Sequence, residues 1–366
     1  MQTVFAYQQS KDANLELSRE FIRERFAPDL NSMELQDKDL LKKQKEEALQ
    51  LFNKNYSDTT TVEHSDEKIA EAVNTTIDDY HRQNQKDFKF FKKNMVSEAE
   101  KIFDRYLSIL LLLIEFQQVA EEDTKLDHSN FVKNLLIKAL KFSDTLENSI
   151  LRRNISWSKD KGEIRQWFKD LIRPDEEYQK YLGLEHPTFE DDKAIINHLV
   201  KNIIFKNEVI DKYLEEQDLN WHEDRAIIKS LTVKTFKTIT SSEEGVELQE
   251  LSYNWEDDKT FFVKLFEETV AVGPEYEEII ANKTKNWDID RIATTDKIIL
   301  EMAISEMINF PSIPVKVTIN EYIEVAKRYS TPKSKMFING VLDVIASDLQ
   351  KAGTIKKSGR GLIDNK

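Results

Sequence analysis

The sequence contains no cysteine, only 8 glycines and 7 prolines among 366 residues, and no long apolar run. Without cysteine, the chain forms neither disulfides nor sites in which thiolates bind zinc or iron–sulfur clusters. Scarce glycine and proline leave few positions for tight turns, which disfavours a β-rich fold. The longest apolar run, residues 109–114, is far shorter than the ~20 residues that cross a bilayer. We therefore expect a mostly helical, cytoplasmic protein with no membrane partner.

The motifs of common enzyme sites are also missing. The 6 histidines are scattered, without the spacing of a metalloprotease site, and no phosphate-binding loop, dinucleotide fingerprint or nucleophile elbow occurs. The acidic pairs at 191–192 and 257–258 lie in charged segments that we interpret as solvated. We expect no enzymatic activity, no catalytic residue, no metal site and no cofactor.

Apolar residues recur at helical spacing through nearly the whole chain. Long helices are predicted at 34–56, 66–120 and 130–151, and the part of the second at 107–114, apolar on almost all sides, should be buried. We expect an N-terminal helical region at 1–240, an acidic linker at 241–258, a C-terminal helical bundle at 259–352 and a basic tail at 353–366.

Charge is distributed unevenly. The net charge is −14, yet residues 286–366 carry 12 basic and 10 acidic side chains. Between Val325 and Leu342 there are four basic residues and no acidic one. A polyanion should therefore approach the C-terminal end of the chain.

Residues 311–349 contain the clearest helix signals. Thr318, followed three residues later by Glu321, matches a capping box and predicts a helix start. Thr331 before Pro332 predicts a second start, because proline at the first helical position has no N–H to lose.

The second of these helices should carry a continuous apolar stripe from residue 337 to residue 349. Gly353 is suited to end it. Gly340 lies inside it and costs ~1 kcal/mol relative to alanine. We expect another helix to approach closely at Gly340.

A set of residues in the C-terminal part of the chain matches a known family pattern in order and at fixed spacing. The matching residues are Trp287, Arg291, Asp296, Lys297, Ile299, Leu300, Glu306, Ile313, Pro314, Ile319, Asn320, Glu321, Ala326, Lys327 and Phe337–Asp343. Through these residues the C-terminal part resembles the NusB family of transcription antitermination factors. A weaker match is the first helix, QTVFAY at residues 2–7, which resembles the start of family members.

The resemblance implies an all-α fold of two packed helical bundles, here with an enlarged N-terminal helical region. It also implies binding of the boxA element of ribosomal RNA leaders together with the ribosomal protein NusE. This assembly belongs to the RNA polymerase antitermination complex and promotes read-through of terminators.

The chain departs from the family pattern at two places. Family members usually have an arginine-rich segment before the first helix, whereas this sequence starts at Met1 inside that helix. Glu301 stands where many members carry arginine. These departures and the net charge of −14 support an alternative function, a helical protein-binding adaptor that has lost its RNA contacts.

Ten residues are candidates for binding under this resemblance. Phe337 could stack on a base or fill the core, and Asn339 could bind a base edge or cap a buried backbone group. Asp296 could face NusE or only complement a helix dipole. The lysines and arginine could contact phosphates or be solvated. The RNA-binding candidates are Gln2, Phe5, Lys327, Arg328, Lys333, Lys335, Phe337 and Asn339, and the partner-binding candidates are Asp296 and Lys316.

Overall fold

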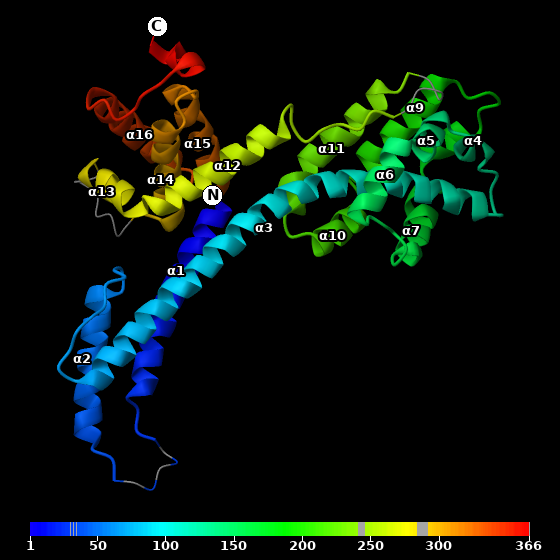
Figure 1. The fold of residues 1–366 in the computed structure, drawn as a ribbon. Coiled ribbons are helices and arrows are strands. Elements are labelled where there is room, and N and C mark those ends of the chain that lie inside the picture. The colour runs from blue at the N-terminus through cyan, green and yellow to red at the C-terminus, as the bar shows by residue number, and fades with distance from the viewer. Residues whose placement is uncertain (30, 32, 34, 241–245, 284–291, 366) are drawn as a thin grey trace. The chain divides into compact units, whose positions relative to one another are not determined.

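The computed structural model describes residues 1–29, 31, 33, 35–240, 246–283 and 292–365, and the regular elements in these ranges are all helices (Figure 1). The prediction of an all-α fold is confirmed. No helix in these ranges is long and apolar enough to cross a bilayer. Trp287 and Arg291, which contribute to the family resemblance, and part of the acidic linker lie outside the described residues.

The helices occur in the following order along the chain. They are α1 (Gln2–Arg25), α2 (Lys38–Asn55), α3 (Glu67–Glu122), α4 (Ser129–Val132), α5 (Leu135–Lys141), α6 (Asp144–Arg153), α7 (Lys161–Trp167), η1 (Phe168–Ile172), α8 (Glu176–Leu182), α9 (Phe189–His198), η2 (Leu199–Ile204), α10 (Glu208–Gln217), α11 (Trp221–Thr238), α12 (Trp255–Ala271), α13 (Gly273–Lys283), α14 (Thr294–Asn309), α15 (Val315–Tyr329), α16 (Ser334–Lys351) and η4 (Gly359–Asn365).

These helices form two compact units. One comprises residues 1–96 and 259–366, and the other comprises residues 97–258. This division differs from the one expected from the sequence, because the first 96 residues lie with the C-terminal helices and not with the middle region. The cause is packing between segments far apart in sequence, which local patterns do not encode.

Helix α1 runs antiparallel to α3 in the first unit. Asn14 Nδ2 donates hydrogen bonds to Asn84 Oδ1 at 2.8 Å and to Asp87 Oδ2 at 2.7 Å. The ring of Tyr7 meets Phe88 of α3 and Phe266 of α12 edge-on, with centroids 5.9 and 6.1 Å apart. The first half of α1 is therefore part of the hydrophobic core that α12–α16 build.

The second half of α1 belongs to a separate hydrophobic cluster with α2 and the start of α3. The largest side chains of this cluster are Ile22, Phe26, Phe52, Ile69 and Ile77. Asp37 caps α2 by accepting hydrogen bonds from the backbone N–H groups of Asp39 and Leu40.

Helices α14, α15 and α16 pack against one another in the first unit (Figure 1). α14 is buried on all sides from Ile298 to Met307. The predicted capping box is wrong: α15 begins at Val315, after Pro314, and the buried Thr318 hydroxyl donates to Glu306 Oε1 at 2.8 Å. The close approach expected at Gly340 is also wrong, because no atom lies within 4 Å of a Cβ built there.

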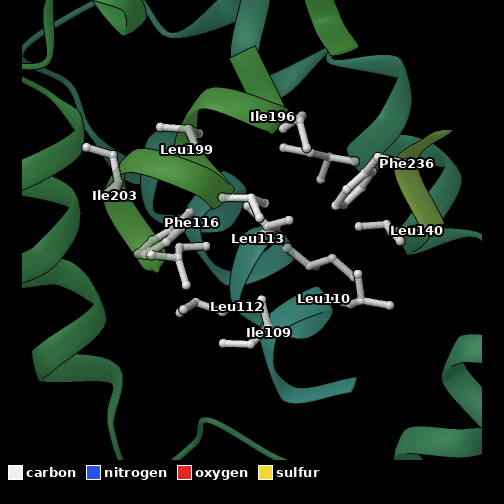
Figure 2. Packing of buried hydrophobic residues seen from close by; sticks show 14 of the residues in the cluster. Ile109, Leu110, Leu112, Leu113, Phe116, Leu140, Ile196, Leu199, Ile203 and Phe236 are labelled. Atoms are coloured by element: carbon white, nitrogen blue, oxygen red, sulfur yellow. The ribbon is translucent and has the colours of Figure 1, made fainter. Parts of the chain in front are cut away.

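The second unit is built around the apolar part of α3. The prediction that residues 107–114 are buried is confirmed for six of the eight, and Ser108 and Leu111 are half-buried. Their side chains pack against residues of α5, η2 and α11, such as Leu140, Ile203 and Phe236 (Figure 2).

The single helix predicted at 130–151 is instead three short helices, α4, α5 and α6. Asn134 accepts hydrogen bonds from the N–H groups of Leu136 and Ile137, and Ser143 accepts one from Leu146. These side chains start new helices, so the chain turns twice within a stretch of continuous helical periodicity.

Candidate nucleic-acid interface

The connection between α15 and α16 is a short turn closed by hydroxyl groups. Ser334 N–H donates to Thr331 O at 2.9 Å, and the two side-chain hydroxyls lie 2.9 Å apart. Ser330 Oγ donates to Asp296 Oδ1 at the start of α14. Helix α16 begins at Ser334, two residues beyond the predicted start at Pro332. The turn therefore holds the end of α15 and the start of α16 against α14.

The four predicted basic residues surround this turn. Lys327 and Arg328 lie in the last turn of α15, Lys333 immediately precedes α16, and Lys335 lies in its first turn; all four are exposed. Lys327 forms an ion pair with Glu324 on its own helix. Within the described ranges, Arg328, Lys333 and Lys335 form no ion pair. Three cations are thus available to an external anion.

Phe337 and Asn339 continue this surface along α16. Phe337 is half-buried and packs against the core of the first unit, so it has both a buried and an accessible part. Asn339 Nδ2 donates to Asp343 Oδ2 at 3.3 Å on the same helix. Sequence reasoning missed Met336, whose side chain is 76% exposed between Lys335 and Phe337.

The start of α1 meets the end of α15. Met1 and Gln2 line a cavity of about 420 Å³ together with Glu321, Glu324, Val325, Arg328 and Tyr329. The structure therefore brings together Gln2 and Arg328, two of the predicted RNA-binding residues that lie at opposite ends of the chain. Phe5, one turn further along α1, is 37% exposed.

The two predicted partner-binding residues do not lie together. Asp296 is only 6% exposed and accepts the hydrogen bond from Ser330, which follows the last residue of α15. Lys316 is exposed in the first turn of α15, and the 15 residues of this helix span ~22 Å. The burial of Asp296 favours a structural role, and its contact with a partner stays a prediction.

Two buried carboxylates lie behind this surface on α14. Glu306 accepts hydrogen bonds from Thr318 Oγ1 at 2.8 Å and from Tyr322 Oη at 3.2 Å, and burial raises the pKa of Glu306. Glu301 is fully buried, and Gln8 Nε2 of α1 donates to its Oε2 at 3.0 Å. Burial raises the pKa of Glu301 to about 7. These acids therefore organise the bundle from inside and are not presented to a ligand.

The chemistry available at this surface is electrostatic attraction, hydrogen bonding and stacking. In the described part of the chain, no group of three or more histidine, aspartate or glutamate side chains is arranged to hold a metal ion. Exposed cations beside a half-exposed aromatic ring are typical of surfaces that bind single-stranded nucleic acid.

Comparison with known proteins locates a family similarity in the C-terminal part of the chain. The model of the NusB family matches residues 228–347, which include α12–α15 and most of α16. The chain is similar to three proteins named transcription antitermination protein NusB. It is 48% identical to that of Salinibacter ruber over 105 residues (29% of this chain, 66% of the relative), 42% identical to that of Chloroherpeton thalassium over 106 residues (29% and 50%) and 40% identical to that of Dictyoglomus turgidum over 106 residues (29% and 72%).

The similarity thus covers about half to three quarters of each relative and less than a third of this chain. No solved structure matches the chain.

Proposed function

The chain belongs to the NusB family, and from this premise we propose that it acts in transcription antitermination as an RNA-binding protein. Its RNA ligand is the boxA element of ribosomal RNA leaders, which it binds together with the ribosomal protein NusE as part of the RNA polymerase antitermination complex. The role is recognition, without an enzymatic step.

One observation carries the proposal: the surface formed by the end of α15, the start of α16 and the start of α1. Arg328, Lys333 and Lys335 are exposed there without ion-pair partners in the described ranges, and phosphate groups supply the missing charges. Phe337 and Met336 lie beside them on α16 and offer an apolar platform to a base. Gln2 reaches the same surface from α1.

Contacts of this kind separate into two classes. The three cations position the RNA backbone and carry no sequence information. Specificity for boxA must come from groups that reach base edges, and we propose Gln2 and Asn339 for that role because each has an amide that both donates and accepts. Phe5 and Phe337 then stack on unpaired bases.

The same charge distribution supports the NusE contact. The chain outside residues 286–366 carries a net charge of −16. A basic ribosomal protein is attracted to this acidic part, while the basic surface remains available for RNA. Lys316 is exposed and stays a candidate for this interface. Asp296 also stays a candidate, although its burial and its hydrogen bond from Ser330 favour a structural role.

The test is a comparison of RNAs. Binding of the full chain to a boxA RNA and to a scrambled RNA of the same length and composition is measured with and without NusE. The proposal expects tighter binding to boxA, with a further gain when NusE is present. Equal affinity for both RNAs contradicts boxA recognition. Binding of NusE without binding of either RNA favours the alternative, a protein-binding adaptor that has lost RNA contacts.

A further inference from the structure

The segment that follows α16 is docked on the bundle. We call residues 354–363 the C-terminal strap. Gly353 has a φ of +74°, which turns the chain back after α16, as the sequence predicts. Thr354 N–H donates to Leu349 O at 2.9 Å, and the side chain of Ile355 is buried. The strap therefore starts as part of the hydrophobic core and not as a loose tail.

The strap continues along the connection between α14 and α15. Ser358 N–H donates to Pro311 O at 2.9 Å, and Lys357 Nζ donates to Phe310 O at 3.0 Å. At Gly361 a Cβ atom would lie 2.1 Å from Pro311 O, so only glycine fits there. The helical turn η4, which contains Gly361, packs against α15. These contacts fix the strap beside the first turn of α15.

This docking concentrates positive charge at the start of α15. The C-terminal strap carries three basic residues, Lys356, Lys357 and Arg360, and no acidic one, in a chain whose net charge is −14. Lys356 and Arg360 are exposed. The N-terminal end of α15 adds a positive partial charge, because Pro314 has no side chain that could cap it.

The strap lies at the opposite end of α15 from Arg328, Lys333 and Lys335, and α15 is ~22 Å long. We propose that the C-terminal strap, with Lys356 and Arg360, is a second phosphate-binding surface, so that one single-stranded RNA contacts both ends of α15. The inference rests on the proposed RNA-binding function. RNA is favoured over an acidic protein because one continuous polyanion satisfies both basic surfaces of the same helix.

The experiment measures the salt dependence of RNA binding by the full chain and two variants. Lys356→Gln/Arg360→Gln removes two charges from the strap. Lys38→Gln/Lys42→Gln removes two exposed charges from α2 and is the control for net charge. For single-stranded RNA, losing two phosphate contacts lowers the slope of log K against log salt by ~1.4, while the control leaves the slope within error of wild type.

A third variant tests the docking without changing charge. Gly361→Ala must displace the strap from Pro311, so it should weaken RNA binding and lower the salt slope as the charge variant does. Its melting temperature, compared with that of Gly162→Ala, where no atom lies within 4 Å of the added Cβ, shows whether the bundle itself stays folded.

The outcomes separate this inference from the proposed function. A strap variant whose slope equals that of the α2 control overturns the inference, even where boxA is bound specifically. Equal binding of boxA and scrambled RNA, with the slope still lowered by the strap variant, contradicts boxA recognition and leaves the strap surface standing. If the strap variant binds RNA as wild type does but loses affinity for NusE, the surface belongs to a protein partner and the inference is overturned. The inference also fails if the full chain binds no RNA.

Discussion

At the scale of single residues, the position of Phe337 between core and solvent decides how base stacking can be tested. The ring packs against the core of the first unit, yet the residue is only half-buried and follows the exposed Met336. A fully buried ring could not stack on RNA, and a fully exposed ring would contribute nothing to folding. An intermediate position allows both contributions, and substitution should reveal each.

We expect Phe337→Ala to lower stability by roughly 1–3 kcal/mol, less than the ~3–5 kcal/mol of a fully buried phenylalanine. Loss of one stacked base should weaken RNA binding by ~1–3 kcal/mol. Denaturant unfolding and RNA titration measure the two effects. Ile338→Ala is the matched control, because Ile338 is fully buried and should lower stability with no effect on RNA affinity of the folded protein. Identical behaviour of the two variants would mean that Phe337 serves the core alone.

Glu301 gives a prediction about pH. Burial raises its pKa from 4.5 to about 7, so the folded state binds more protons than the unfolded state between these values. Stability contributed by this group is therefore complete below pH 4.5 and is lost as the pH rises to about 7. Glu301→Gln should flatten this dependence and raise stability at pH 8 by roughly 1–3 kcal/mol.

Denaturant unfolding of wild type and Glu301→Gln at pH 5 and pH 8 measures this difference. Surface aspartate and glutamate residues change the free energy of unfolding with pH by the same amount in both proteins, so their effect cancels in the comparison. A variant that is less stable than wild type at pH 8 would show that the ionised carboxylate is needed, for instance to accept the hydrogen bond from Gln8.

At the scale of helices, the sequence predicts those elements whose signals are local. The end of α16 at Gly353 and the buried stretch 107–114 follow from end signals and periodicity. The misassigned start of α15 has a physical cause: Thr318 resembles a capping residue, but its hydroxyl is used by Glu306 inside the bundle. Sequence spacing cannot distinguish these two uses of a threonine.

The helix caps of the second unit yield a prediction at this scale. Asn134 and Asn207 each cap a helix, but Asn134 is fully buried and also donates to Tyr181 Oη and Asp192 O. Asn207→Ala should cost ~1 kcal/mol, the usual value of a lost cap. Asn134→Ala should cost ~1–3 kcal/mol more, because it leaves buried partners unsatisfied. If the two variants lose the same free energy of unfolding in denaturant, burial does not increase the contribution of the Asn134 cap.

At the scale of the whole molecule, the sequence predicts the basic part of the candidate interface but not the distant segments that pack beside it. The basic residues between 325 and 342 are visible as a local charge pattern. The meeting of Gln2 with Arg328, the docking of the strap on Pro311 and the assignment of residues 1–96 to the C-terminal unit all depend on long-range packing. Such contacts have no signature in one sequence read window by window.

The two units should respond separately to core mutations, since each has its own hydrophobic core. We expect two transitions in calorimetry. Trp167→Ala, in the second unit, and Leu342→Ala, in the first, should each lower a different transition temperature, because each removes a fully buried side chain. One transition lowered by both variants would show that the shared helices α3 and α12 couple the units completely.

The most direct test of the central claim, that the turn between α15 and α16 binds RNA, is the salt dependence of boxA RNA binding by Arg328→Gln/Lys333→Gln/Lys335→Gln. Losing three phosphate contacts should lower the slope of log K against log salt by ~2, and affinity should fall accordingly. The control Lys38→Gln/Lys42→Gln/Lys43→Gln changes the net charge equally on α2 and should bind RNA as wild type does. A triple variant at the α15–α16 turn that matches this control in slope and affinity would contradict the account.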